Sequence, residues 1–325
     1  MPPAPIGILY EHPEWFEPLF AELDRRGLAY TRILAHQHRY DPAAREAPYS
    51  LVVNRVSPSA YLRGHARAIF CAQQFLAHLE RLGVPIVNGS RAYAFELSKA
   101  RQLDLLAALG LPHPASRVAN DPRQLVAAAQ ELEVPLIAKP NVGGSGALMR
   151  RFDDLATLAM AAETGELDGL FEIDGTAVVQ EYHPPRDGSI VRVEALDNAF
   201  LYAIRIWNDP DQGFNLCPAD ICQPDFCPVD SSKAGRRIEH EQSPPDWVVE
   251  SVLRVFKAAE IDVGGVEYLE SERDGRVYFY DINALSNFVT DAPSLVGFDP
   301  FVRFVDFLEH RLKEASPGWT SIAAG

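Results

Sequence analysis

The chain has 325 residues, of which 47% are hydrophobic and 23% are charged, enough for two or three domains that each have a core. Its 30 lysines and arginines against 45 aspartates and glutamates give a net charge of -15, and no basic cluster is long enough to follow a phosphate backbone. This composition argues against a disordered chain and against nucleic acid as a general partner.

Neither a targeting signal nor a membrane span is visible in the sequence. The N-terminus lacks a basic region followed by a long apolar stretch, and no segment approaches the ~20 apolar residues that a span needs. We therefore expect a cytoplasmic protein with no membrane partner. The four cysteines, Cys71, Cys217, Cys222 and Cys227, are too few for a disulfide framework. The last three recur every five residues, which leaves a metal site open beside the simpler interpretation of reduced cysteines in a loop.

The first 90 residues alternate between short apolar strands and amphipathic helices. This alternation predicts a parallel sheet, because parallel neighbours need a crossover between them. We expect strands at Ile6–Tyr10, Tyr30–Leu34, Leu51–Asn54 and Val84–Gly89, and helices from about Glu14 to Gly27 and from Ala66 to Leu82. Residues 1–89 would then form a first domain that binds substrate.

Ligands bind open α/β sheets beyond the carboxyl ends of the strands. Arg55 and Ser57 follow the third predicted strand and are the leading substrate candidates in this domain. For each residue alone, a role in a turn is the competing interpretation, because asparagine and serine are common in turns. Further candidates at these strand ends are Glu11, His12, Asn54 and Ser59.

A second domain is predicted at residues 90–182, and its main feature is a lysine that leads into a glycine-rich loop. The buried strand Val134–Ala138 delivers Lys139 to the loop formed by Gly143, Gly144, Ser145 and Gly146. Such a loop is typical of a cover over phosphates, because its backbone N–H groups can point at anionic oxygens. The other predicted elements are a helix from Phe95 to Leu109, a helix capped by Asp121 that reaches Leu132, a strand over Ala147–Phe152, a helix capped by Asp153 and a strand over Thr176–Tyr182.

The third predicted domain, residues 183–325, carries hard oxygen ligands on two neighbouring strands. Glu267 lies in the strand Val266–Glu270, while Asp281 and Asn283 lie in Tyr278–Asn283. Carboxylate and amide oxygens are the ligands that Mg²⁺ prefers. Also predicted are a hairpin of Ser189–Leu196 and Phe200–Trp207, an irregular stretch over Asn208–Gln242, a helix capped by Asp246 and a last helix over Pro300–Leu312.

Taken in order, these motifs resemble the ATP-grasp superfamily, and within it the glutathione synthetase-like and RimK-type carboxylate-amine ligases. The resemblance covers roughly Pro85 to Leu312. It implies an α/β (α+β) protein with three domains along the chain: an N-terminal parallel-sheet domain, a central lid domain and a C-terminal domain with a mainly antiparallel sheet. The motifs are Ser98-Lys99 opening a helix before a Gly-Leu-Pro-x-Pro segment, Lys139-Pro140 with its loop, Gln180-Glu181-Tyr182, Arg192, Arg205, Glu267 and Asp281-x-Asn283.

The resemblance implies roles for these residues in binding ATP and its metal. Lys99 and Lys139, with the amides of Gly143, Gly144, Ser145 and Gly146, would hold the phosphates. Gln180, Glu181 and the backbone at Tyr182 would contact adenine, and Asp187 the ribose. Glu267, Asp281 and Asn283 would hold Mg²⁺, with Mn²⁺ as an alternative. For Lys99 the competing interpretation is an ordinary solvated lysine, and for Glu181 a surface carboxylate.

The implied reaction joins a small carboxylate to an amine through an acyl phosphate, with release of ADP and phosphate. Arg192 and Arg205 would bind anionic oxygens; a cross-strand salt bridge to Glu194 is the alternative for Arg192. Asn215 and Asn287 are further substrate candidates, and homo-oligomers are common among such ligases. Two other functions remain open: a small-molecule kinase at the same site, and a nucleotide-binding regulator on a degenerate fold.

Overall fold

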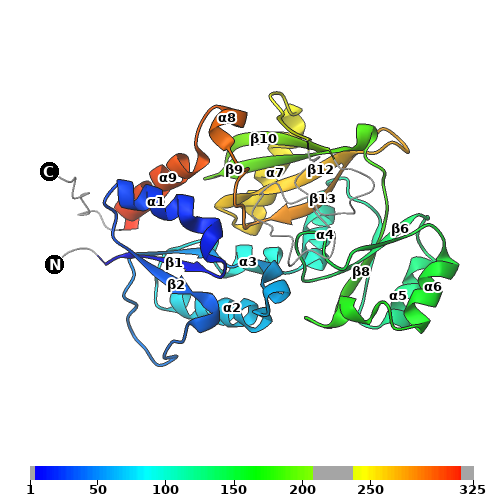
Figure 1. The fold of residues 1–325 in the computed structure, drawn as a ribbon, viewed down its shortest axis with the longest axis horizontal. Coiled ribbons are helices and arrows are strands. Elements are labelled where there is room, and N and C mark those ends of the chain that lie inside the picture. The colour runs from blue at the N-terminus through cyan, green and yellow to red at the C-terminus, as the bar shows by residue number, and fades with distance from the viewer. Residues whose placement is uncertain (1–3, 208–236, 316–325) are drawn as a thin grey trace.

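The computed structural model describes residues 4–207 and 237–315, which form three β-sheets and their covering helices. A parallel sheet lies at one end of the molecule and a small antiparallel sheet at the other, with a five-stranded sheet between them (Figure 1). Each sheet takes its strands from one of the three predicted ranges. The domain boundaries at residues 89 and 182 stay a prediction. No helix of the described ranges is long and apolar enough to span a bilayer.

The N-terminal sheet is parallel, as predicted, with the strand order β2-β1-β3-β4. Every residue of β1 and β3 is buried, as expected for central strands with helices on both faces. The bounds are β1 Ile6–Tyr10, β2 Tyr30–Leu34, β3 Leu51–Arg55, β4 Ile86–Val87, α1 Glu17–Arg25 and α2 Ala66–Arg81, with 3₁₀ turns at Pro13–Phe16, Ala35–Gln37 and Pro58–Arg63. The helix predicted from Glu14 therefore begins as a 3₁₀ turn.

The second sheet along the chain, which we call the central sheet after its place in the sequence, lies at the end of the molecule opposite the parallel sheet. It is antiparallel with the order β5-β8-β6-β7, and its two helices, α5 and α6, pack against one face. Leu136, Ala138, Phe152 and Val179 belong to the shared core. The strand β5 was not predicted. The bounds are β5 Ser116–Ala119, α5 Pro122–Ala129, β6 Leu136–Pro140, β7 Arg150–Phe152, α6 Leu155–Glu163 and β8 Ala177–Glu181, with a 3₁₀ turn at Asp168–Phe171.

The single helix predicted from Phe95 to Leu109 is wrong, because the chain forms α3 (Ser90–Glu96) and α4 (Lys99–Ala108) there. Ser98 separates them: its backbone is extended, and its hydroxyl accepts a hydrogen bond from the Arg101 N–H, which makes it the N-cap of α4. The cap makes Lys99 the first residue of a helix. A smaller error concerns α6, which is capped by Asp154 instead of Asp153.

The C-terminal sheet is antiparallel with the order β11-β10-β9-β12-β13. One face packs on α7, and the other shares a core with α1 and α9. The bounds are β9 Ser189–Leu196, β10 Ala199–Trp207, β11 Arg237–His240, α7 Asp246–Ala259, β12 Val263–Glu270, β13 Val277–Asn283, α8 Ala292–Val296 and α9 Pro300–Ala315, with a 3₁₀ turn at Arg186–Gly188. Asp246 is the first residue of α7 rather than its cap. The predicted irregular stretch contains β11, and its substrate candidate Asn215, with Cys217, Cys222 and Cys227, lies outside the described residues.

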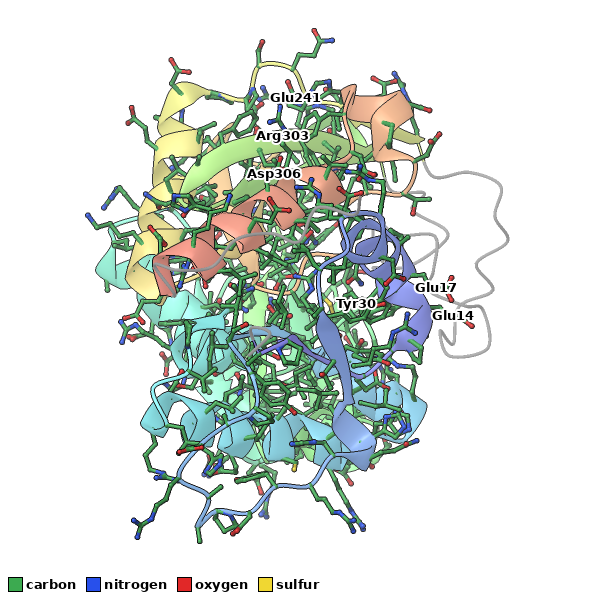
Figure 2. The ribbon with its side chains drawn as sticks, turned by 90° about the vertical axis from the view of Figure 1, so that its left-hand side faces the viewer. Glu14, Glu17, Tyr30, Glu241, Arg303 and Asp306 are labelled. Carbon is green, nitrogen blue, oxygen red and sulfur yellow. The ribbon has the colours of Figure 1, made fainter. Side chains whose placement is uncertain are left out.

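The last helix connects the C-terminal part of the chain to the N-terminal sheet. Arg26, which follows α1, donates hydrogen bonds to Asp306 Oδ1 at 2.7 Å and to the Val302 carbonyl at 3.0 Å, both on α9. Figure 2 shows this end of the molecule, with Asp306 and Arg303 on α9 above Tyr30 of β2. The contact brings the first and third sheets together, and their shared boundary forms one wall of the site described next.

Candidate active site

A cavity of about 210 Å³ opens where the three sheets meet. The central sheet contributes the end of β6, the loop after it and the end of β8, while β9, β12 and β13 form the opposite wall. The 3₁₀ turn at Pro58–Arg63 and Trp15, in the 3₁₀ turn at Pro13–Phe16, close the third side. Of the predicted site residues, the cavity is lined by Ser57, Lys99, Lys139, Gly143, Gly144, Ser145, Gly146, Gln180, Glu181, Tyr182, Arg192, Glu267, Asp281, Asn283 and Asn287.

Lys139 is a buried lysine at the end of β6, with only 3% of its surface exposed. Its Nζ donates a hydrogen bond to Gln180 Oε1 at 2.8 Å. Burial, together with the nearby charge of Lys99, lowers the pKa of Lys139 to about 7. Gln180 is a neutral partner, so this ammonium has no carboxylate bonded to it among the residues that the structure describes. A buried cation of this kind favours an anionic ligand.

The second lysine reaches the same cavity from the start of α4. Lys99 forms an ion pair with Asp281 of β13. Burial opposes the charge of Lys99, but the attraction of Asp281 outweighs it and raises the pKa of the lysine. Burial likewise disfavours the charged carboxylate, and Lys99 reverses this effect and lowers the pKa of Asp281. Lys99 is therefore no solvated surface lysine.

The three predicted metal ligands share one face of the C-terminal sheet. Glu267 of β12 lies opposite Asp281 of β13 in the strand register, and Asn283 follows two residues later. Residues two apart on a strand point to the same side. The Asn283 amide donates to Asp281 Oδ2 at 3.2 Å. Two carboxylates and an amide oxygen on one face are a donor set that fits Mg²⁺.

The environment of Glu267 supports this fit. Burial and the negative charge of Asp281 raise the pKa of Glu267 to about 7, and Arg192 acts in the opposite direction. The Tyr280 hydroxyl donates to Glu267 Oε2 at 2.9 Å, and Arg192 Nη1 lies 3.3 Å from its Oε1. Like charges held close together in a buried place favour a bound cation.

Two glycines of β12 make the close packing of this face possible. A side chain at Gly264 would overlap the Asn283 carbonyl oxygen. At Gly265, a β-carbon would lie 2.8 Å from Arg192 Nε and 2.9 Å from Glu194 Oε1. These glycines therefore leave room for the strand end that carries Asn283 and for the Arg192–Glu194 ion pair.

We expect the substitution Gly264→Ala to destabilise the protein by about 3 kcal/mol, because the new methyl group overlaps a backbone atom that cannot rotate away. Denaturant unfolding monitored by fluorescence measures the change. The matched control is Gly169→Ala, whose methyl group would meet only Leu148 Cδ2 at 4.0 Å and should leave the stability within about 1 kcal/mol. Equal stability of the two variants would contradict the tight contact at β12.

The glycine-rich loop spans the gap between the central and N-terminal sheets. Ser145 and Gly146 both have a left-handed backbone, with φ of 56° and 68°. A β-carbon on Gly144 would lie 3.1 Å from the β-carbon of Ser59, so this glycine permits a close approach to the turn after β3. The turn continues to Met149, and the strand predicted from Ala147 begins only at Arg150.

The predicted adenine edge lies at the end of β8. The Gln180 amide is held between Lys139 and the Ser116 hydroxyl, to which its Nε2 donates at 2.9 Å. Glu181 Oε1 accepts from the Glu133 N–H at 2.9 Å. Asp187, the predicted ribose ligand, does not line the cavity, because it lies exposed in a left-handed turn before β9. The structure therefore does not support Asp187 as part of the site.

The two predicted catalytic arginines lie on opposite faces of the C-terminal sheet. Arg192 is buried in the cavity wall between Glu194, at 2.6 Å, and Glu267. Arg205 pairs with Val191 in the strand register, so it points to the other face, where it forms an ion pair with Glu241 at 2.7 Å. Figure 2 shows Glu241 near the top of the molecule. Arg205 does not line the cavity, which argues against its predicted catalytic role.

Arg55 also lies outside the cavity, although it was a leading substrate candidate. It is 1% exposed, and its Nη2 donates to the Ser286 carbonyl of the turn after β13. Its Nε and Nη1 atoms have no hydrogen-bond partner among the described residues. Burial lowers the pKa of Arg55 to about 10. Arg55 therefore joins the N-terminal sheet to the turn that carries Asn287.

The other N-terminal candidates divide in a similar way. Ser59 lines the cavity beside Ser57, whose hydroxyl accepts from the Ser59 N–H at 3.1 Å. Asn54 donates to the Asn88 carbonyl at 3.2 Å, and His12 stacks on Trp15. Glu11 belongs to a cluster with His36 and His65 that has the composition of a metal site. Arg63 already pairs with both oxygens of Glu11, so we interpret this cluster as an ion-pair network.

Several further cavity residues were not predicted from the sequence, among them Trp15, Glu96 and His183. Glu96 ends α3 and accepts hydrogen bonds from the backbone N–H groups of Ala284 and Leu285. Burial raises its pKa to about 7, while the Leu285 hydrogen bond acts in the opposite direction. The sequence signal for Glu96 was its position three residues before Lys99. Its place at the cavity depends on the helix break at Ser98.

The fold is similar to that of several solved structures, among them ligases. No protein-family model matches the sequence. The ATP-grasp ligase PsnB, in complex with a minimal precursor, superposes with a TM-score of 0.64 at 21% identity, over 94% of this chain and 99% of that one. The RimK domain ATP-grasp protein from Sphaerobacter thermophilus gives 0.65 at 17%, over 94% and 99%. D-Alanine–D-alanine ligase from Bacillus anthracis, in complex with ATP, gives 0.68 at 17%, over 97% and 100%.

Proposed function

Because the chain has the ATP-grasp fold, as predicted, we propose that it is an ATP-dependent carboxylate-amine ligase. One observation carries the proposal: two lysines from different elements converge on a cavity whose opposite wall holds the facing carboxylates Glu267 and Asp281. Cations for phosphates and anions for their metal thus lie within one cavity. PsnB and the D-alanine–D-alanine ligase are both ligases, which supports the same reaction type.

In this proposal, ATP lies between the central and C-terminal sheets. Lys99 and Lys139 bind its phosphates under the loop of Gly143, Gly144 and Gly146, whose backbone donors favour anionic oxygens. The adenine ring lies toward the end of β8, near Glu181 and Tyr182. The lysines currently contact Asp281 and Gln180, so nucleotide binding exchanges these contacts for phosphate contacts.

Glu267, Asp281 and Asn283 would hold Mg²⁺, which neutralises charge on the phosphates when bound. Arg192 is placed beside Glu267 and stays charged, because Glu194 and Glu267 more than offset the effect of its burial and raise its pKa. Its guanidinium would orient the substrate carboxylate or the transferring phosphoryl group. The carboxylate attacks the γ-phosphate and releases ADP, and the amine then attacks the acyl phosphate and releases phosphate.

We expect nucleotide affinity without metal to fall as the pH rises above 7. The pKa of Lys139 in the free protein is about 7, below its usual value of 10.5, so its ammonium is lost above that pH unless a bound phosphate raises the pKa again. Linkage then predicts that the Kd for ADP increases by up to about tenfold per pH unit above 7. Calorimetry from pH 6.5 to 9 measures this slope. Because Glu267 titrates in the same range, the Lys139→Met variant serves as the control, and an equal slope in both proteins would contradict the assignment.

The proposed function is tested by measuring ADP and phosphate release from MgATP with amino acids and short peptides, singly and in pairs, and by mass spectrometry of each product. The ligase requires two substrates and yields an amide. A stable phosphorylated product from one substrate would identify a kinase instead. Absence of turnover with every pair, in a protein that binds ATP, would favour a nucleotide-binding regulator.

A further inference from the structure

The charged residues that line the cavity come from α3, α4, β6, β8, β9, β12 and β13. The carboxylates among them already have partners within the protein. For example, Glu96 accepts hydrogen bonds from two backbone N–H groups, and Asp281 forms an ion pair with Lys99. None comes from the N-terminal sheet or from the turn after β13. The complete charged set among the described residues is Glu96, Lys99, Lys139, Glu181, Arg192, Glu267 and Asp281.

Among the residues that the structure describes, the remaining wall of the cavity is neutral. From the N-terminal sheet come Trp15, Ser57, Pro58 and Ser59, and the turn after β13 contributes Leu285, Asn287 and Phe288. We call these seven residues the neutral wall. It combines apolar surface with two hydroxyl groups and one amide. Such a surface can enclose an apolar or hydrogen-bonding group, whereas a charged group would lose its hydration there without gaining a counter-ion.

Two arginines beside the neutral wall, Arg63 and Arg55, do not line the cavity. Arg63 lies over the Trp15 ring at 4.7 Å, and its guanidinium is bound to Glu11. Arg55 is buried behind the turn and donates to Ser286. Redirecting either arginine toward a ligand would leave Glu11 or the Ser286 carbonyl without its present donor, which is costly inside a protein.

The turn that carries three of the seven residues of the neutral wall is held in place by buried groups from four elements. Glu96 binds its first N–H groups, Asn88 donates to the Ala284 carbonyl and Arg55 donates to the Ser286 carbonyl. The Ser286 hydroxyl donates to Glu194 Oε1 at 2.8 Å. The Asn287 Oδ1 atom is buried and has no hydrogen-bond partner among the described residues. A fixed turn therefore holds the Asn287 side chain at the cavity wall.

We propose that the substrate group bound between the N-terminal sheet and the turn after β13 is uncharged, so that the enzyme selects neutral amino acids or neutral residues of a peptide over acidic and basic ones. This inference rests on the proposed ligase function. It names the substrate class: a side chain with apolar surface that can also exchange a hydrogen bond with the Asn287 amide or the serine hydroxyls. The reacting carboxylate lies at the other end, toward Arg192.

The test uses substrates that match in size and differ in charge. Phosphate release from MgATP is measured with glutamine against glutamate, asparagine against aspartate, and norleucine against lysine, each as the free amino acid and at the same position of a dipeptide, and each paired with the panel of amino acids and short peptides as second substrate. We expect kcat/KM to be at least about tenfold higher for the neutral member of every pair that reacts. Turnover restricted to charged members would overturn the inference while leaving the ligase function intact, and absence of turnover with all compounds would refute the proposed function and the inference with it.

A single substitution tests the wall itself. Asn287→Asp keeps the shape of the side chain and adds a buried negative charge, so it should lower kcat/KM for neutral substrates by at least about tenfold and shift the norleucine-to-lysine ratio toward lysine. The affinity for ADP should stay within about twofold, which separates this effect from loss of the fold. The matched control is Asn198→Asp, at the exposed turn between β9 and β10, which should change neither value. An unchanged ratio in a folded Asn287→Asp protein would contradict the proposal.

Discussion

Replacing Lys139 by methionine should weaken ATP binding by about 100-fold while the protein stays folded. The methionine keeps the apolar length of the buried stem and removes the ammonium that we assign to a phosphate. Charge-assisted hydrogen bonds of this kind in a buried place contribute about 2–3 kcal/mol, which corresponds to a change of roughly 30- to 150-fold. Because Gln180 can keep its bond to Ser116, the variant leaves only one neutral acceptor without its donor.

Isothermal calorimetry with ADP and with ATP measures the effect of Lys139→Met. The control is Lys257→Met on the exposed face of α7, which removes the same charge from the chain without touching the cavity. Comparison of the two variants separates local binding from the general effect of a more negative protein. Equal nucleotide affinities for wild type and Lys139→Met would refute the phosphate role of Lys139.

Replacing Asp281 by asparagine should lower turnover by about 100-fold or more and raise the Mg²⁺ concentration needed for half-maximal activity. The exchange preserves size and removes one carboxylate of the facing pair with Glu267. It also removes the ion-pair partner of Lys99. A ligand that must neutralise developing phosphate charge acts mainly in the transition state, so kcat should change more than the KM for ATP.

A Mg²⁺ titration of phosphate release measures this change, and metal binding is followed separately by calorimetry with Mn²⁺ in the absence of substrate. Asp104→Asn is the control, because Asp104 is exposed on α4, the helix that begins with Lys99. Normal turnover of Asp281→Asn over the whole titration would contradict the metal role. Loss of Mn²⁺ binding together with normal circular dichroism would support it.

Much of the fold could be predicted because its strands have strong local signals. The strands β1, β2 and β9 have the predicted bounds, since apolar runs between turn residues leave little choice of register. Lys139 and its loop were also predictable, because a lysine at the end of a buried strand followed by three glycines in four residues is uncommon. The order of the motifs along the chain then predicted the fold.

Whether a residue faces the cavity or points away from it was harder to predict. Arg192 and Arg205 looked equivalent in the sequence, and only the pairing of β9 with β10 places Arg205 opposite Val191, on the face away from the cavity. Arg55 follows a strand end, as a ligand-binding residue would, but the turn after β13 covers it. This burial depends on a contact between residues 231 positions apart, which no local pattern encodes.

Helix breaks and close contacts caused the remaining errors. The apolar pattern predicted one helix from Phe95 across Ser98, although the resemblance implied a helix that begins at Ser98-Lys99, and the position of Glu96 was not predicted. The predicted strand began at Val266, so the close contact of Gly264 in β12 with the Asn283 carbonyl was not predicted either. In both cases the competing effect is tertiary: a side chain or a backbone atom from a distant element fixes the local conformation.

The central claim is that a carboxylate oxygen attacks the γ-phosphate before the amine reacts, and an isotope experiment tests it most directly. A reactive substrate pair is supplied with ¹⁸O in both oxygens of the carboxylate, and the released phosphate is analysed by mass spectrometry. We predict that each phosphate carries one ¹⁸O atom and that the amide retains the other. Phosphate without the label, released at the same rate as ADP, would contradict an acyl phosphate and with it the proposed ligase mechanism.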